Sequence, residues 1–196
     1  MTLTGEQIDL LDRYWRLLER WNSKINLTAL PLRGYPAHSI DRLIVEPLMA
    51  AALMPLEPLD WYDLGSGGGS PAVPLKVMRP AARLTMVESR SRKAAFLREV
   101  LRNTGFAETA RVENARLEEV ARSHPAVADF VTVRAVRVDG ALLDTIRTLL
   151  KPAGCLVLFE SVETRRELSG FQLFNKISIP STGAVICLLV PRGTKG

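Results

Sequence analysis

The stretch of sequence that decides the fold reads Trp61-Tyr-Asp-Leu-Gly-Ser-Gly-Gly-Gly-Ser-Pro71. An apolar strand runs directly into four glycines, and a proline suited to the first turn of a helix follows them. In open parallel sheets, ligands bind beyond the carboxyl end of such a strand, and glycines let the backbone adopt positive φ and approach a ligand closely. We therefore expect a ligand-binding turn over residues 65–71.

Short apolar strands alternate with helices on the carboxyl side of residue 58. The pattern predicts strands at 61–64, 83–87, 110–113, 130–134, 155–159, 172–179 and 185–190. It predicts helices at 71–78, 90–103, 116–123 and 140–150, with a shorter one near 162–168. Strands separated by helices require a mostly parallel sheet with right-handed crossovers. The turn Pro180-Ser-Thr-Gly183 joins the last two strands with no helix between them, so these form a hairpin and the final strand runs antiparallel.

This layout predicts an α/β fold of the Rossmann-like kind found in class I methyltransferases that use S-adenosylmethionine. Seven strands in a mostly parallel sheet, with an antiparallel last strand, are typical of that class. The inference concerns the fold, and a fold does not fix a function.

A helical extension precedes the sheet. Thr4 and Gln7 have the spacing of a capping box, and apolar residues then recur every three or four positions up to residue 22. A second helix is predicted at 39–54, kinked or split by Pro47. The rigid segment Pro55-Leu-Glu-Pro58 marks the boundary that we expect between an extension of residues 1–58 and a main domain of residues 59–196.

Composition excludes several classes of protein. The chain has 196 residues, 47% of them apolar, which suits one ordered domain with a small addition. The longest apolar run, 185–190, is far too short to cross a bilayer, and the charged N-terminal helix does not resemble a signal peptide. We therefore expect a soluble, cytoplasmic protein that does not associate with membranes. The two cysteines have no cysteine or histidine at close spacing, so no metal site is expected.

Positive charge is concentrated in the main domain. Residues 1–60 carry a net charge of −2 and residues 61–196 a net charge of +7. Eight basic residues lie between Lys76 and Arg102, opposed only by Glu88 and Glu99. A basic face is typical of a protein that binds a polyanion such as nucleic acid, although a solvated helix surface would give the same composition.

Two carboxylates indicate which ligand the glycine turn binds. A dinucleotide fingerprint would need glycine at its sixth place, where Ser70 stands. Asp63, two residues before Gly65, would repel a pyrophosphate and suits a ligand with a cationic amino acid end, such as S-adenosylmethionine. Glu88 ends the second strand, where a carboxylate can accept both hydroxyls of a ribose. The residues thus favour S-adenosylmethionine, with a nicotinamide cofactor as the alternative.

The fourth strand ends in Arg134, which can donate to a phosphate, a carboxylate or the edge of a base. The alternative is an ion pair with Asp129 or Glu118. The element Asn/Asp-Pro-Pro-aromatic, usual for methylation of exocyclic amines, is absent at this place. An unprotonated nitrogen such as guanine N7 needs no general base, and catalysis can then rest on alignment of the reacting atoms.

Several short motifs occur together in one order along the chain. They are Trp21-Asn22, Asn26-Leu27-Thr28, His38 with Asp41, the run from Asp63 to Leu75, Ser89 with Arg92-Lys93 and Phe96-Leu97, residues 116–119, and Arg134-Ala135. In this combination the chain resembles the RsmG (GidB) family of bacterial small-subunit ribosomal RNA guanine-N7 methyltransferases.

The resemblance implies transfer of a methyl group from S-adenosylmethionine to N7 of a guanosine in 16S ribosomal RNA, in the cytoplasm. The partner would be small-subunit ribosomal RNA or a subunit precursor, and we expect a monomer. Arg134 would lie near the methyl group and the base, as the catalytic residue. The cofactor-binding residues would be Asp63, Gly65, Ser66, Gly67, Gly69, Ser70, Glu88, Leu117, Glu118 and Arg134, with Leu117 and Glu118 beside the adenine.

The chain also departs from the family pattern. Ser70-Pro71-Ala72 stands where the family usually has Leu-Pro-Gly, Val133 stands in place of a serine, Glu160 follows the fifth strand in place of a lysine, and residues 183–185 lack the usual arginine. Two cations are thus missing on the side expected to bind RNA. Methylation of another RNA, a protein or a small molecule therefore remains an alternative, as does a catalytically silent homologue that binds S-adenosylmethionine or RNA.

Overall fold

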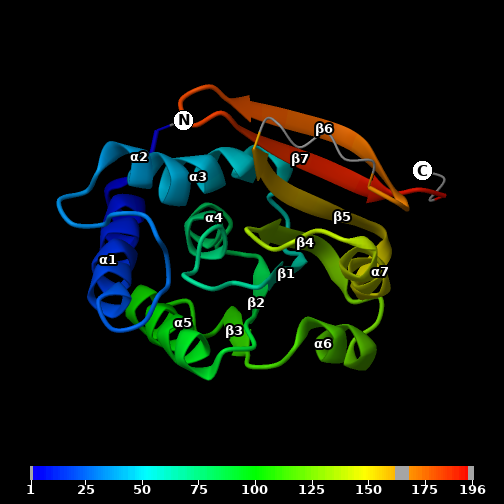
Figure 1. Ribbon diagram of the computed structural model, residues 1–196, viewed down its shortest axis with the longest axis horizontal. Helices are drawn as coiled ribbons and strands as arrows, with labels where there is room; N and C mark the ends of the chain where they lie inside the picture. The colour runs from blue at the N-terminus through cyan, green and yellow to red at the C-terminus, as the bar shows by residue number, and fades with distance from the viewer. Residues whose placement is uncertain (1, 162–167, 194–196) are drawn as a thin grey trace.

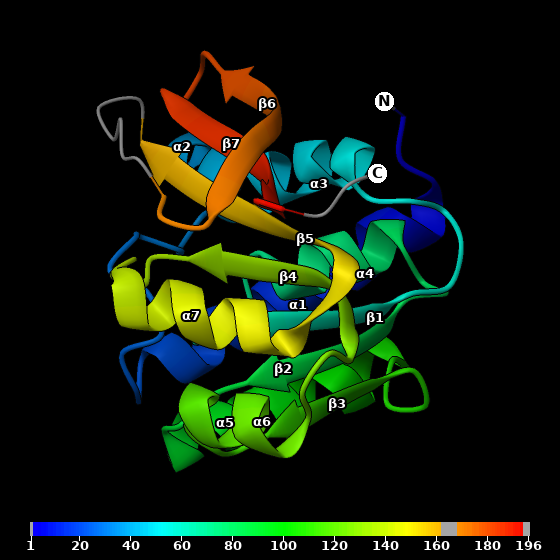
Figure 2. The same cartoon turned by 90° about the vertical axis from the view of Figure 1, so that its right-hand side faces the viewer.

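The computed structural model describes residues 2–161 and 168–193. They form one seven-stranded sheet in the order β3-β2-β1-β4-β5-β7-β6, seen from β3 to β6 in Figure 2. The strands are β1 (Asp60–Leu64), β2 (Arg83–Val87), β3 (Ala110–Glu113), β4 (Ala128–Arg134), β5 (Leu150–Ser161), β6 (Phe171–Ile179) and β7 (Ala184–Pro191). The helix predicted near 162–168 falls almost entirely outside the described residues.

The topology matches the prediction from sequence. The pairs formed among β1 to β5 are parallel, and β7 runs antiparallel between β5 and β6. In the register of β1, Leu64 lies opposite both Val87 of β2 and Val133 of β4. The three strands therefore end at one level, which brings the glycine turn, Glu88 and Arg134 to the same edge of the sheet.

Strand β5 is longer than the predicted strand at 155–159. It includes Pro152 and Gly154, residue types that normally interrupt a strand. In the structure β5 begins at Leu150, and the register with β4 shifts between Ala128 and Phe130. A Cβ atom at Gly154 would lie 2.7 Å from the carbonyl oxygen of Ala128. Glycine therefore permits the close approach of the two backbones, which the sequence pattern did not indicate.

Helices cover both faces of the sheet (Figure 1). One face carries α1 (Gly5–Asn22), α4 (Ala72–Met78) and α5 (Ser91–Thr104), and the other carries α6 (Leu117–Ser123) and α7 (Gly140–Leu149). Strand residues alternate between these faces, so Trp61 and Tyr62 are buried in different core clusters. Among the described helices, none combines the length and the apolar character that crossing a bilayer requires.

The second N-terminal helix, predicted at 39–54, is an irregular helical run of four parts. They are α2 (Ala37–Ile40), a π-helical segment η1 (Asp41–Val45), α3 (Glu46–Ala50) and a 3₁₀ turn η2 (Ala51–Leu53). Pro47 has no amide hydrogen for the carbonyl of Leu43, and its ring crowds that carbonyl in a regular α-helix. The wider π-helical segment precedes the proline, and Ser70 Oγ donates to the Leu43 carbonyl at 2.8 Å.

The N-terminal helices share a core with the sheet. Leu18 of α1, Leu48 of α3 and Trp61 of β1 belong to one cluster of buried side chains. This shared core does not test whether residues 1–58 and 59–196 are separate units, so the boundary at Pro58 remains a prediction.

A buried tyrosine joins α1 to the glycine turn. The hydroxyl of Tyr14 donates to the carbonyl oxygen of Gly68 at 2.7 Å, and the side chain is fully buried. Burial raises the pKa of Tyr14, so the hydroxyl remains a donor at physiological pH. The N-terminal helix therefore fixes the position of the turn directly.

Replacing this donor tests how much α1 stabilises the turn. We expect Tyr14→Phe to lower the free energy of unfolding by about 1–2 kcal/mol, because the carbonyl of Gly68 loses its donor in a buried place. The control is Tyr35→Phe. The hydroxyl of Tyr35 donates to Asp12 on the surface, and its loss should lower the free energy of unfolding by about 0.5 kcal/mol or less. Urea denaturation measures both, and equal losses would contradict the assignment.

Candidate functional site

The glycine turn after β1 has a backbone that side chains could not adopt without strain. Gly65, Gly67 and Gly69 have φ values of 71°, 51° and 86°. The amides of Gly65 and Ser66 donate to the carbonyl oxygen of Val87 at 2.9 and 3.1 Å, which pins the turn to the end of β2. A Cβ atom at Gly65 would lie 2.8 Å from Val136 Cγ2, so glycine leaves room for the segment that follows β4.

A first cavity of about 440 Å³ opens on one side of this turn. Its walls come from the ends of β1 and β2, the start of α6 and the segment between β4 and α7. The predicted residues Gly65, Glu88, Leu117 and Glu118 all line it. Three carboxylates (Glu88, Glu118 and Asp139) and two guanidinium groups (Arg116 and Arg137) are among its lining residues.

Glu88 is held in a fixed orientation at the end of β2. Its Oε2 accepts from the amide of Gly67 at 2.9 Å, and its Oε1 accepts from the amide of Arg90 at 2.8 Å. Asn114 Nδ2 donates to the backbone carbonyl of Glu88 at 2.9 Å. Each carboxylate oxygen retains acceptor capacity, so Glu88 can still accept from two hydroxyl groups of a ligand.

A second cavity of about 320 Å³ opens on the other side of the turn. Gly65 borders both cavities, and Ser66, Gly67, Ser70 and Arg134 line this one. The remaining wall comes from the N-terminal extension and α5, through Leu18, Leu27, Thr28, Leu30, Arg42, Leu43 and Lys93. Leu27 and Thr28 belong to a motif that carries the family resemblance, but the prediction from sequence did not place the extension in the site.

Arg134 lies in a buried network at the end of β4. Its Nη2 is 2.7 Å from Glu46 Oε2, its Nη1 donates to Ser70 Oγ at 3.0 Å, and its guanidinium lies 5.5 Å from the centre of the Phe159 ring. Burial lowers the pKa of Arg134, and the Glu46 carboxylate opposes that shift. The ion pair therefore forms with Glu46 and not with Asp129 or Glu118, the partners considered from the sequence.

Asp63 lies beneath the turn and lines neither cavity. Its Oδ1 accepts from Thr132 Oγ1 at 2.5 Å, and Thr132 Oγ1 in turn accepts from Trp61 Nε1 at 2.9 Å. The other oxygen, Oδ2, is buried without a hydrogen-bond partner in the described structure. Burial raises the pKa of Asp63 to about 6, because the charged form loses its hydration.

Gly69 also lies away from both cavities. A Cβ atom there would meet Val73, Tyr14 and Leu97 at 3.1 to 3.4 Å, so this glycine serves the packing of the turn against α1, α4 and α5. Its predicted contact with a cofactor remains a prediction.

Sequence reasoning missed Glu46, Thr132, Arg42 and Lys93 as members of the site. Glu46 carried a signal that could have been used, since it is an acidic residue between the apolar runs 43–45 and 47–54, and a buried acidic residue needs a partner. Lys93 lay in a motif quoted for the family resemblance. Thr132 gave no signal, because its contacts with Trp61 and Asp63 join segments far apart in the sequence. Arg42 lies four residues before Glu46, a spacing that pairs side chains on one helix face, and this signal was not used.

The Thr132 hydroxyl can be tested through stability. We expect Thr132→Val to lower the free energy of unfolding by about 1–3 kcal/mol, because it leaves Trp61 Nε1 and the Asp63 carboxylate buried without their partner. The pKa of Asp63 should rise further, since the hydrogen bond from Thr132 lowers it. Thr132→Ser keeps the hydroxyl and should recover most of the loss. Unfolding by urea at pH 7 provides the measurement, and a Val variant as stable as the parent would disprove the role.

The fold of this chain is that of known methyltransferases. It resembles the crystal structure of a SAM-dependent methyltransferase from Aquifex aeolicus with a TM-score of 0.60 at 12% identity, over 77% of this chain and 91% of that one. It also resembles a mutant of MtNAS in complex with S-adenosylmethionine, with a TM-score of 0.65 at 14% identity, over 93% of this chain and 71% of that one. At these identities the likeness concerns the fold alone, and it confirms the fold class predicted from sequence.

The sequence itself matches a family. Residues 7–180 match the family described as GidB, rRNA small subunit methyltransferase G. The chain is 36% identical to the ribosomal RNA small subunit methyltransferase G of Xanthomonas campestris pv. campestris strain B100, over 80% of this chain and 70% of that protein. The resemblance noted in the motifs is thereby confirmed, and the chain belongs to the rRNA small subunit methyltransferase G (GidB) family.

Proposed function

We propose that this protein transfers a methyl group from S-adenosylmethionine to N7 of a guanosine in 16S ribosomal RNA. Membership of the family supports an S-adenosylmethionine-dependent enzyme that acts on small-subunit ribosomal RNA. The single observation that carries the proposal is the meeting of two cavities at Gly65, with Glu88 in one and Arg134 in the other. The cytoplasm, where ribosomal RNA is modified, is the compartment that this function requires.

The residues of the first cavity fit the adenosine part of the cofactor. Glu88 offers two oriented oxygens to the ribose hydroxyls, and Leu117 offers an apolar wall for the adenine. Gly65, which borders both cavities, permits close passage of the amino acid end toward the second cavity. Asp63 lies beneath the turn and lines neither cavity, so its carboxylate would attract the cofactor's ammonium group through its charge and not by direct exposure in a cavity. When bound, the cofactor supplies a sulfonium methyl group open to a nucleophile.

The second cavity fits a purine that needs orientation and no deprotonation. Arg134 is held by Glu46 and Ser70, and it retains donors that can bind the O6 edge of a guanine. Among the described residues that line the two cavities there is no histidine or cysteine. Because guanine N7 carries a lone pair and no proton, alignment of N7 with the methyl group suffices for the reaction.

Methyl transfer is tested with small-subunit ribosomal RNA from cells that lack the endogenous enzyme. We expect tritium from labelled S-adenosylmethionine to enter that RNA and to be recovered as 7-methylguanosine after digestion. Arg134→Lys keeps the charge but loses the planar fork, so we expect kcat to fall at least about tenfold while the Kd for S-adenosylmethionine changes less than about threefold.

This variant is chosen because Arg134→Ala would leave Glu46 buried with one partner fewer. Tight binding of the cofactor without transfer to any RNA would reject the substrate. Equal losses in cofactor affinity and turnover by Arg134→Lys would instead move Arg134 into the cofactor site.

The pKa of Asp63 predicts a pH dependence of cofactor binding. The ionised carboxylate favours a cationic ligand, and protonation below a pKa of about 6 removes that attraction. We therefore expect the Kd for S-adenosylmethionine to rise about tenfold between pH 7.5 and pH 5. Asp63→Asn should bind more weakly at pH 7.5 and show little change with pH. Calorimetric titration at several pH values decides this, and the same pH dependence in both proteins would contradict the role of Asp63.

A further inference from the structure

The wall of the second cavity carries three cations from three different elements. Arg42 comes from η1, Lys93 from the first turn of α5 and Arg134 from the end of β4. None of the described residues that line this cavity is acidic. The cavity therefore attracts an anion, unlike the first cavity, in which carboxylates and guanidinium groups are mixed.

Glu46 compensates only part of this charge. Its carboxylate, with 1% of the side chain exposed, receives Arg42 Nη1 at 3.0 Å on Oε1 and Arg134 Nη2 at 2.7 Å on Oε2. One carboxylate between two guanidinium groups leaves one positive charge. Lys93 on α5 adds a second, because it makes no hydrogen bond or ion pair within the described part of the chain.

The three cations differ in their access to solvent. Arg134 is deep, with 10% of its side chain exposed, whereas Arg42 has 32% exposed and Lys93 is half-buried. Within the described residues Arg42 donates to Glu46 alone, so most of its five donors remain for a ligand. An anion that enters from solvent therefore meets Arg42 and Lys93 before it reaches Arg134.

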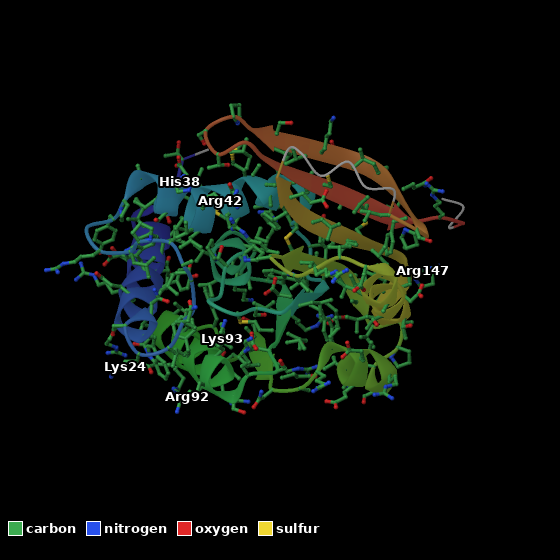
Figure 3. The ribbon with its side chains drawn as sticks, in the orientation of Figure 1. Lys24, His38, Arg42, Arg92, Lys93 and Arg147 are labelled. Atoms are coloured by element: carbon green, nitrogen blue, oxygen red, sulfur yellow. The ribbon has the colours of Figure 1, made fainter. Side chains whose placement is uncertain are left out.

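We propose that Arg42 and Lys93 bind a backbone phosphate of the RNA substrate at the mouth of the second cavity, and that Glu46 is the positioning residue for Arg42. The proposal rests on the proposed function and names the contacts of its substrate. Figure 3 shows Arg42 on the N-terminal helical run and Lys93 on α5, above and below the region of the glycine turn. A phosphate between them would fix the strand while the base extends toward Arg134.

The surroundings of the cavity favour RNA phosphate over the cofactor's carboxylate. Lys24 follows the end of α1 and Arg92 precedes Lys93 on α5, and both are exposed. The two helices lie side by side, since Trp21 Nε1 of α1 donates to Glu99 Oε2 of α5 at 3.0 Å. The cations thus continue along the surface away from the cavity, which suits a polyanion with successive phosphates better than one carboxylate.

The experiment measures RNA binding without turnover. A fluorescently labelled, protein-free transcript of 16S ribosomal RNA is titrated with protein at several salt concentrations, and S-adenosylmethionine is titrated separately. We expect Arg42→Ala and Lys93→Ala each to weaken RNA binding about five- to twentyfold and to reduce the slope of log Kd against log salt by about 0.7–0.9. The Kd for S-adenosylmethionine should change less than twofold.

The matched control is Arg147→Ala, which removes the same charge from an exposed position on α7, away from the second cavity (Figure 3). It should leave both the RNA affinity and the salt slope unchanged within twofold.

The positioning role of Glu46 has its own variants. Glu46→Gln removes a negative charge and should not reduce the salt slope, but it should lower RNA affinity, because a neutral amide holds the guanidinium of Arg42 less firmly. Since Glu46 is buried, Arg42→Lys is measured beside it. Arg42→Lys keeps the charge and should preserve the salt slope, but it should lose affinity because an ammonium cannot reproduce the oriented fork.

Three results would overturn the proposal. The first is that Arg42→Ala and Lys93→Ala bind RNA with the same affinity and the same salt slope as Arg147→Ala. The second is weaker S-adenosylmethionine binding with an unchanged RNA salt slope, which would assign the anion to the cofactor's carboxylate. The third is full RNA affinity in Arg42→Lys, which would remove the need for a positioned fork. Failure of the proposed function would give a different result. If the parent protein binds RNA with the expected salt slope but transfers no methyl group, the reaction is contradicted and the phosphate contacts are supported.

Discussion

Glu46 of α3 meets Arg134 of β4 at 2.7 Å, and both side chains are almost fully buried. Removing either partner of such a pair leaves an uncompensated charge in a medium of low dielectric constant, at a cost of about 3–5 kcal/mol. The pair thereby fixes the N-terminal helical run against the carboxyl edge of the sheet. The second cavity exists because of this attachment, since one of its walls comes from that run.

The two cavities divide the chemistry of the site by charge. Opposite charges are mixed in the first, which suits a neutral nucleoside with hydroxyl groups to be oriented. Only cations occur among the charged residues described for the second. The family resemblance led us to expect a lysine after β5 and an arginine before β7, and this chain has neither. Its cations come instead from η1 and from the first turn of α5, through Arg42 and Lys93, so the departures from the family pattern do not leave the second cavity without positive charge.

Local patterns predicted the parts of the structure that are set by local chemistry. The capping box at Thr4, the strand-turn-helix around Gly65 and the hairpin at 180–183 all depend on residues near one another in sequence, and the structure contains each of them. Glu88 was placed correctly because parallel strands end at one edge. The partners of Arg134 and Asp63 were not predictable, because Glu46 and Thr132 lie 88 and 69 residues away and only tertiary packing selects them.

Pro47 lacks an amide hydrogen, and this affects how the helical run contacts the glycine turn. Because proline cannot donate, the carbonyl of Leu43 remains available to Ser70 Oγ, which also accepts from Arg134 Nη1. A residue with an amide at position 47 would supply a second donor to the carbonyl that accepts from Ser70 Oγ. Pro47 thus leaves the helical run with an acceptor that ties it, through Ser70, to the guanidinium of Arg134 at the end of β4.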